Sequence, residues 1–148
     1  MPSLARLTRR AEFLRTASAR KKWVAPGVIV QARARQPGEA LAAGGDDDRQ
    51  ARVGLTVSRK VGNAVQRNRA RRRLRALARD LLPEMGRPGT DYVFIGRRAT
   101  PTRPAANLRS DVATALRRVN AQVDGTSKGR RRPRRGTAAP AGGTETSA

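Results

Sequence analysis

The segment from residue 59 to residue 79, RKVGNAVQRNRARRRLRALAR, concentrates side chains of one chemical type at a regular spacing. It holds nine basic residues and no acidic one. On a helix, four of its arginines would form a single row, because they recur at every fourth position: Arg67, Arg71, Arg75 and Arg79. Guanidinium groups in such a row can bind phosphates, since their planar donors grip two phosphate oxygens at once.

A solvated basic face without a partner is the alternative explanation for this row. Like charges four residues apart repel each other by roughly 0.2–0.5 kcal/mol per pair, and here no glutamate relieves the repulsion. The lack of a counter-charge along about 30 Å of helix therefore favours a bound polyanion. If about six basic residues contact phosphates, log K should fall with log salt at a slope of roughly −4 to −5.

The composition argues against catalysis by protein side chains. The chain has no cysteine and no histidine, so disulfides, thiolate metal sites, Ser-His-Asp triads and the usual neutral-pH general base are all missing. A stand-alone metal nuclease would need converging carboxylates, and the candidates are Asp80, Glu84, Asp91 and the run Asp46-Asp47-Asp48. Adjacent carboxylates in a Gly-rich loop are more often solvated than metal-bound, so we expect no metal held by the protein.

The overall charge indicates a polyanionic partner. Lys and Arg total 33 against 11 acidic residues, a net charge of +22 over 148 residues. Nucleic acid fits this charge because each phosphate contact releases condensed counterions. A membrane surface fits less well, since aromatic residues are only 3% of the chain and no stretch reaches the roughly 18 apolar residues that span a bilayer. We therefore expect a cytoplasmic protein that does not bind membranes.

Apolar spacing predicts an α+β fold, with a small, mostly antiparallel sheet packed with helices in the order α-β-β-α-β-α. The predicted segments are a helix at 7–16, a strand at 24–34 that begins near Val28, a strand at 52–58, a helix from the cap Asn63 to Pro83, a strand at 92–95 and a helix from Pro104. Leu7, Phe13 and Leu14 are expected to share one side of the first helix. Residues 1–123 should form one RNA-binding domain with a flexible loop at 36–50, and residues 124–148 a disordered basic tail.

The run from Val57 to Arg75 resembles the signature of the bacterial ribonuclease P protein family. The family's signature has a strand that ends in Ser-Lys-Lys, then Val-Gly-Asn-Ala-Val, Arg-Asn-Arg, a basic pair and a further Arg. This chain has Ser58-Arg59-Lys60, Val61-Gly62-Asn63-Ala64-Val65, Arg67-Asn68-Arg69, Arg71-Arg72 and Arg75 at these places. A weaker resemblance extends over about residues 7–119 and includes the pair Glu12-Phe13.

This resemblance implies that the helix carrying the Arg-Asn-Arg motif docks on a catalytic RNA. The residues expected at this contact are Arg59, Lys60, Arg67, Asn68, Arg69, Arg71, Arg72 and Arg75. The resemblance also implies a left-handed crossover between strand and helix, which is an exception to the usual handedness. Gly62 would allow the chain to turn there.

The family also has a cleft between the first helix and the sheet that holds the single-stranded 5′ leader of precursor tRNA. Phe13 matches an aromatic residue of that cleft, on which a base can stack with little sequence preference. Two further cleft positions that often carry aromatic rings are Ala17 and Gln31 here. We therefore expect weaker leader binding, or compensation from Trp23 and the basic residues 20–22. Core packing explains Phe13 equally well, and it explains Trp23 better.

These expectations describe a protein subunit of ribonuclease P that binds the catalytic RNA and the leader of precursor tRNA, one protein per RNA. It would assist the endonucleolytic 5′ maturation of tRNA without catalytic residues or a cofactor of its own. Mg²⁺ would belong to the RNA, because this ion prefers phosphate and water ligands. Composition alone would favour a non-enzymatic RNA-binding protein of the ribosomal-protein type.

Overall fold

The computed structural model describes residues 5–7, 9–36 and 50–129 of the chain. Its α+β class is the class that the sequence predicts. The elements in chain order are β1 (Ala5–Arg6), α1 (Arg10–Ser18), β2 (Lys21–Val24), β3 (Val28–Ala34), β4 (Arg52–Thr56), the 3-10 helix η2 (Arg59–Val61), α2 (Ala64–Met85), β5 (Thr90–Gly96) and α3 (Ala105–Gly129).

The five strands form one mixed sheet in the order β1-β4-β5-β3-β2. The pairings of β2 with β3 and of β3 with β5 are antiparallel, whereas β4 is parallel to both β1 and β5. Helix α2 is the connection between the neighbouring parallel strands β4 and β5. The left hand expected for this crossover stays a prediction.

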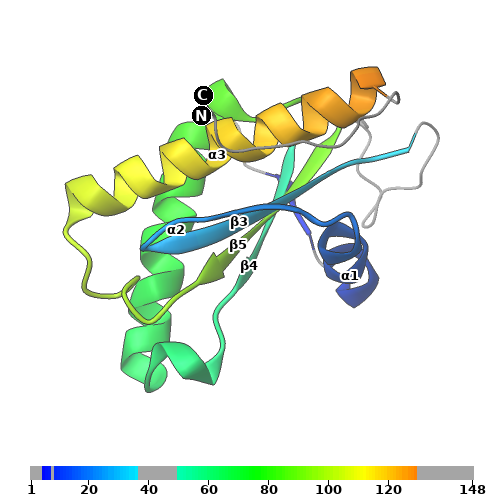
Figure 1. Cartoon of the computed structure of the whole chain (residues 1–148). Helices are drawn as coiled ribbons and strands as arrows, with labels where there is room; N and C mark the ends of the chain where they lie inside the picture. The colour runs from blue at the N-terminus through cyan, green and yellow to red at the C-terminus, as the bar shows by residue number, and fades with distance from the viewer. Residues whose placement is uncertain (1–4, 8, 37–49, 130–148) are drawn as a thin grey trace, which may run out of the picture.

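Helices cover both faces of the sheet. In Figure 1, α2 and α3 lie on one side of the strands and α1 lies on the other. The apolar core fills the space under α2 and α3, where alternate residues of the strands meet the apolar stripes of both helices. Its fully buried members include Val30, Phe94, Leu74, Ala78, Val112 and Leu116. The periodicity of these stripes is that of an amphipathic helix.

The N-terminal helix differs from the sequence-based prediction. It begins at Arg10 instead of residue 7, because Leu7 instead extends β1 with a hydrogen bond from its N–H to the carbonyl of Val53 (2.9 Å). Leu14 is 53% exposed, so the prediction that Leu7, Phe13 and Leu14 share one side of this helix is wrong. The buried side of α1 is polar, formed by Glu12 and Thr16, and it is stable because both side chains have hydrogen-bond partners.

Other element boundaries also differ from the predicted ones. The strand expected to begin near Val28 is confirmed as β3, but the sequence did not predict β2, with which β3 forms a hairpin closed by a 2.8 Å hydrogen bond from the N–H of Ala25 to the carbonyl of Val28. Pro83 lies inside α2 instead of ending it. The missing N–H leaves only the carbonyl of Arg79 without its helical partner, and Arg79 is exposed to water.

The boundary between domain and tail is later than expected. Helix α3 continues to Gly129, past the predicted start of the tail at Asp124. Asp124 forms an ion pair with Arg87 (2.8 Å), which stabilises the helix beyond the last core residue, Val123. The rest of the predicted tail, from residue 130, lies outside the described residues, as do residues 37–49 of the predicted loop.

Candidate RNA-binding surface

The turn that leads into α2 is built by local hydrogen bonds. Asn63 caps the helix as predicted: its Oδ1 accepts a bond from the N–H of Gln66 (2.9 Å), and Gln66 Oε1 accepts one from the N–H of Asn63 (3.1 Å). Gly62 has a φ of +149°, and a Cβ there would lie 1.9 Å from Gln66 Oε1. The chain therefore needs glycine at this turn. Arg59 and Lys60 lie just before the turn and are exposed to solvent.

Two arginines of the predicted row also form hydrogen bonds to residues within α2 or in the turn just before it. Arg67 Nη1 donates to the carbonyl of Gly62 (2.9 Å), so this side chain braces the turn. Arg71 Nη1 donates to Asn68 Oδ1 (3.1 Å). Each guanidinium has five N–H donors, so both retain donors for a partner.

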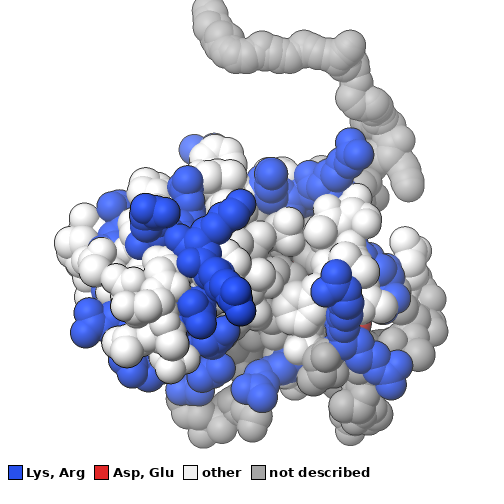
Figure 2. Space-filling model, turned by 90° about the horizontal axis from the view of Figure 1, so that it is seen from below, with Lys and Arg blue, Asp and Glu red and all other residues white. Residues whose placement is uncertain are grey.

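The basic residues occupy the solvent side of α2, and the apolar residues occupy its buried side. Asn68, Arg69, Arg72 and Arg79 are exposed, while Arg67, Arg71 and Arg75 are half-buried. The first acidic residue along α2 is Asp80, whose carboxylate binds Arg109 at 3.1 Å. On the face seen in Figure 2, Lys and Arg gather in broad bands, and Asp and Glu are almost absent from the described surface.

Arg73, which the sequence did not single out, has a structural role. Its Nη1 donates to the carbonyl of Thr100 (2.7 Å), and its Nη2 donates to the carbonyl of Arg103. These bonds fasten α2 to the loop before α3. Because the acceptors are backbone carbonyls 27 and 30 residues away, no local sequence pattern distinguishes Arg73 from the exposed Arg72.

A pocket of about 550 Å³ opens between α1, the β1–β4 edge of the sheet and α2. Apolar residues and arginines line it together: Arg6, Leu7, Phe13, Val53, Gly54, Leu55, Arg71, Arg75, Ala78 and Arg79. Of the three residues expected in a leader cleft, only Phe13 lines this pocket. Ala17 is exposed on α1 and Gln31 is half-buried on β3.

The ring of Phe13 lies directly on the backbone of Gly54. A Cβ at Gly54 would come within 2.5 Å of both Cε1 and Cζ of the ring. Phe13 is therefore packed against the sheet and also borders the pocket. Core packing and a place in a binding cleft, the two roles predicted for this residue, are thus compatible. Gly54 contributes to the site by leaving room for the ring, a role that the alternating pattern of β4 did not indicate.

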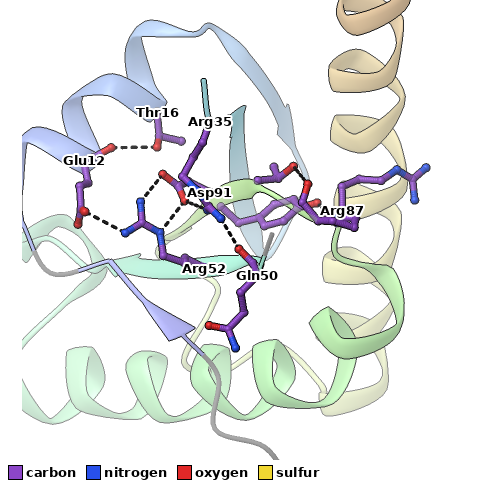
Figure 3. A network of polar contacts seen from close by, with 10 residues as sticks. Glu12, Thr16, Arg35, Gln50, Arg52, Arg87 and Asp91 are labelled. Carbon is purple, nitrogen blue, oxygen red and sulfur yellow. Dashed lines mark hydrogen bonds and ion pairs between the residues drawn. The ribbon is translucent and has the colours of Figure 1, made fainter. Parts of the chain in front are cut away.

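A buried network of charges holds α1 against the sheet next to this pocket (Figure 3). Arg52 donates to Glu12 Oε2 (3.0 Å) on one side and to Asp91 Oδ1 and Oδ2 (both 2.9 Å) on the other. Burial lowers the pKa of Arg52, but the hydrogen bonds and charges of Asp91 and Glu12 outweigh this effect and raise it above its usual value. Since Glu12 precedes Phe13, this network fixes the place of the ring.

Trp23 does not line the pocket. It is half-buried on β2, and the guanidinium carbon of Arg118 lies 5.1 Å from the centre of its ring. This is a cation–π contact between the edge strand and α3. The contact fits the packing role expected for Trp23 better than the suggested compensation in a leader cleft.

The described residues hold no group of three carboxylates that could bind a metal ion together. Asp91 is committed to Arg52 and Arg35, and Asp80 to Arg109. The run Asp46–Asp48 lies outside the described residues. In the part of the chain that the structure describes, no helix is both long and apolar enough to cross a bilayer.

Comparisons with known proteins agree on one family. The Ribonuclease P family model matches residues 1–120. The ribonuclease P protein component of Paramagnetospirillum magneticum is 50% identical over 119 residues, which are 80% of this chain and 84% of that protein. The component of Ruegeria pomeroyi is 51% identical over 116 residues, 78% of this chain and 86% of that protein.

Solved structures agree with these sequence matches. The RNase P protein from Thermotoga maritima has a TM-score of 0.60 at 25% identity, over 76% of this chain and 96% of that one. The Staphylococcus aureus RNase P protein has a TM-score of 0.62 at 20% identity, over 82% of this chain and 98% of that one, which is a likeness of fold.

Proposed function

The chain belongs to the ribonuclease P protein family and takes part in tRNA processing as a protein subunit of ribonuclease P. We propose which parts of its surface bind the two RNAs of that enzyme. Helix α2 docks on the catalytic RNA of the holoenzyme, one protein per RNA. The pocket beside Phe13 receives the 5′ leader of precursor tRNA. The assembly acts in the cytoplasm.

The observation that carries the RNA-docking proposal is the unopposed charge on α2. Its exposed side presents Arg69, Arg72 and Arg79 to solvent, and the half-buried Arg71 and Arg75 lie beside them. The first acidic residue of α2, Asp80, is already paired with Arg109. A phosphate backbone would neutralise the row and release its counterions on binding.

The leader proposal rests on the combination of one aromatic ring with several cations in the same pocket. Bases stack on aromatic rings with little sequence preference, which suits leaders of varied sequence. Arginines around the ring can bind the phosphates that link the bases. With Ala17 and Gln31 outside the pocket, Phe13 is the single aromatic residue among the described residues that line it.

We assign bond cleavage to the RNA and its Mg²⁺, and positioning to the protein. The chain has no histidine and no cysteine, and the buried carboxylates Glu12 and Asp91 are bound by Arg52. By neutralising phosphates where the two RNAs approach each other, the protein lowers the Mg²⁺ concentration that the reaction needs.

The decisive experiment mixes the purified protein with its cognate catalytic RNA and precursor tRNA at low Mg²⁺. We expect 5′ cleavage to be faster than with the RNA alone. An unchanged rate would reject the proposal. The second candidate function, a ribosomal-type RNA-binding protein, is favoured only by the net charge, and it predicts equal affinity for unrelated structured RNAs at matched salt.

Two sets of variants separate docking from leader binding. Arg67→Ala with Arg71→Ala should weaken assembly with the catalytic RNA and flatten its salt dependence, by about 0.9 in slope for each lost duplex phosphate contact. Phe13→Ala should spare assembly and weaken binding of substrates that carry a leader. The control is Arg98→Ala with Arg117→Ala, which removes the same charge from exposed positions outside α2.

A further inference from the structure

Helix α2 carries two sets of arginines, and each set lines a different cavity. The pocket beside Phe13 is bordered by the first set, Arg71, Arg75 and Arg79. A second groove, of about 600 Å³, is bordered by the other set, Arg69, Arg72 and Arg73. Its opposite wall is formed by residues 101–105, which comprise the end of the loop before α3 and the first residue of that helix. In Figure 1 this loop lies on the side of α2 away from α1.

The three arginines of this groove have two different tasks. They stand at i, i+3 and i+4 along the chain, so they share one face of α2. Arg73 holds the two walls together, because it donates to the carbonyls of Thr100 and Arg103 in the loop. Arg69 and Arg72 are exposed. Their Cβ atoms should be about 5–6 Å apart, as in other helical pairs of this spacing, so both guanidiniums can bind one phosphate.

The opposite wall of the groove offers small side chains and no free charge. Thr102, Pro104 and Ala105 are exposed there, and the charge of Arg103 is balanced by its ion pair with Asp111. Among the described residues that line the groove, none is acidic and none is aromatic. An anion can therefore reach the exposed arginines of α2, but no ring is present on which a base could stack.

The two cavities differ in the form of RNA that they fit. The pocket beside Phe13 combines cations with a ring, which suits an unpaired base and its phosphate. The second groove combines cations with a hydroxyl and small aliphatic side chains. These groups suit a strand whose bases are already paired and stacked with one another, because such a strand presents ribose and phosphate to the protein. Double-stranded RNA is recognised mainly through these backbone groups.

We infer that the groove between α2 and residues 101–105 holds the sugar–phosphate backbone of a base-paired segment of the catalytic RNA. Arg69 and Arg72 bind its phosphates, and the hydroxyl of Thr102 bonds to a phosphate or to a ribose 2′-hydroxyl. Arg73 is a positioning residue that keeps the loop against α2. The inference rests on the proposed function and deepens it, because it adds the start of α3 to the docking surface and specifies paired RNA as its partner.

Two neighbouring alanines provide a matched test. Ala105 lines the groove, whereas Ala106, which is also exposed in the first turn of α3, is not among the lining residues. A glutamate is compatible with the helix dipole at both positions, so both variants should fold alike, which thermal unfolding checks. Ala105→Glu should raise the Kd for the catalytic RNA roughly fivefold to tenfold by repelling its phosphates, and Ala106→Glu should change it little. Equal effects of the two variants would overturn the inference.

A single cysteine can report which part of the catalytic RNA lies in the groove, because the chain has none of its own. Thr102→Cys, coupled to an iron chelate that generates hydroxyl radicals, should cut both strands of one RNA helix in the assembled holoenzyme. Ser110→Cys, at an exposed position of α3 outside the groove, is the control. Cuts confined to unpaired nucleotides, or the same cuts from both positions, would contradict the inference.

Two short RNA probes separate failure of this groove from failure of the proposed function. One is a duplex and the other is an unstructured oligouridylate with the same number of phosphates, and each is titrated with the full chain alone. Ala105→Glu should weaken binding of the duplex and spare the single strand, whereas Phe13→Ala should do the reverse. This result would support the groove even if the protein failed to assemble with the catalytic RNA. Equal loss of both probes with Ala105→Glu would contradict a site for paired RNA.

Discussion

Arg52 of β4 and Asp91 of β5 lie at directly paired positions of the sheet, and the arginine grips both carboxylate oxygens at 2.9 Å. Both side chains are almost completely removed from solvent, as is Glu12, which accepts the third hydrogen bond of Arg52 at 3.0 Å. This buried arginine connects the sheet to α1. The orientation of Phe13 over Gly54 therefore depends on a charge network located one residue earlier on α1 and two residues earlier on β4.

Arg52→Met should lower the free energy of unfolding by about 3 kcal/mol, because it leaves two buried carboxylates with fewer partners. Asp91 keeps its bond to Arg35 (2.6 Å), so the loss should stay at the lower end of the range for broken buried pairs. Urea denaturation of the variant and the parent protein measures the difference.

Arg109→Met is the matched control, because it breaks an ion pair whose side chains are 52% and 58% exposed. Such pairs contribute at most about 1 kcal/mol. Similar losses for the two variants would show that the buried network does not hold α1 in place.

The parts of the fold that the sequence predicts are those with a repeating apolar pattern. Leu74, Ala78 and Leu81 recur along α2 and are buried where the pattern expects them. The first helix has no such pattern, because its buried positions are Glu12 and Thr16. The burial of Glu12 depends on Arg52, 40 residues away, and no local rule reveals that partner.

The candidate site shows the same limit. The arginine row on α2 was predicted from spacing alone, and none of its members is buried. Arg79 is exposed, and Arg67, Arg71 and Arg75 are half-buried. The sequence did not indicate that Arg6 and Arg79 would share a pocket with Phe13. Arg6 reaches this pocket through the pairing of β1 with β4, two strands that are far apart in the sequence. A two-residue strand is too short for a period-two signal.

Gly54→Ala should displace the ring of Phe13, because the new methyl group would lie 2.5 Å from it. We expect a loss of about 1–3 kcal/mol in stability, the usual cost of an overpacked contact. Leader-dependent binding should weaken along with it, while assembly with the catalytic RNA persists. Equilibrium unfolding and the two binding assays check these outcomes.

A double variant tests whether the clash with Phe13 is the cause. With Phe13→Ala already present, Gly54→Ala should cost much less, since the two substitutions act through one contact. Additive losses would locate the effect elsewhere. Gly125→Ala is the control for glycine replacement itself, as nothing lies within 4 Å of the added carbon.

The neighbours Arg72 and Arg73 should respond in opposite ways to alanine substitution. Arg73→Ala removes two bonds from a cationic group to the carbonyls of Thr100 and Arg103, so it should destabilise the fold by about 1.5–3 kcal/mol. Arg72→Ala should leave stability within about 0.5 kcal/mol and weaken binding to the catalytic RNA. Thermal unfolding and filter binding at matched salt, measured on both variants, separate the roles. A stability loss at Arg72 equal to that at Arg73 would contradict the assignment.

Tyr92 should make the protein sensitive to alkaline pH. It is fully buried, donates to Asn120 Oδ1 (2.6 Å) and accepts a bond from the N–H of Arg87 (2.7 Å). Burial raises its pKa, and the charge of Asp124 adds to this effect, although Arg87 acts in the opposite direction. In the unfolded chain the phenol ionises near its ordinary pKa of about 10, while the folded chain keeps it neutral. Stability is therefore unaffected below that pH and falls as pH rises toward the higher pKa of the folded state.

Because the chain has one tyrosine, absorbance of the tyrosinate follows this group directly. The titration midpoint should lie above about 10 in buffer and return to about 10 in concentrated urea. Tyr92→Phe should cost about 1–2 kcal/mol at neutral pH, since it leaves Asn120 Oδ1 and the N–H of Arg87 without their partner. The variant should also lose less stability than the parent above pH 10 or so, because it has no phenol to ionise. Identical titration midpoints in buffer and in urea would mean that solvent reaches the hydroxyl.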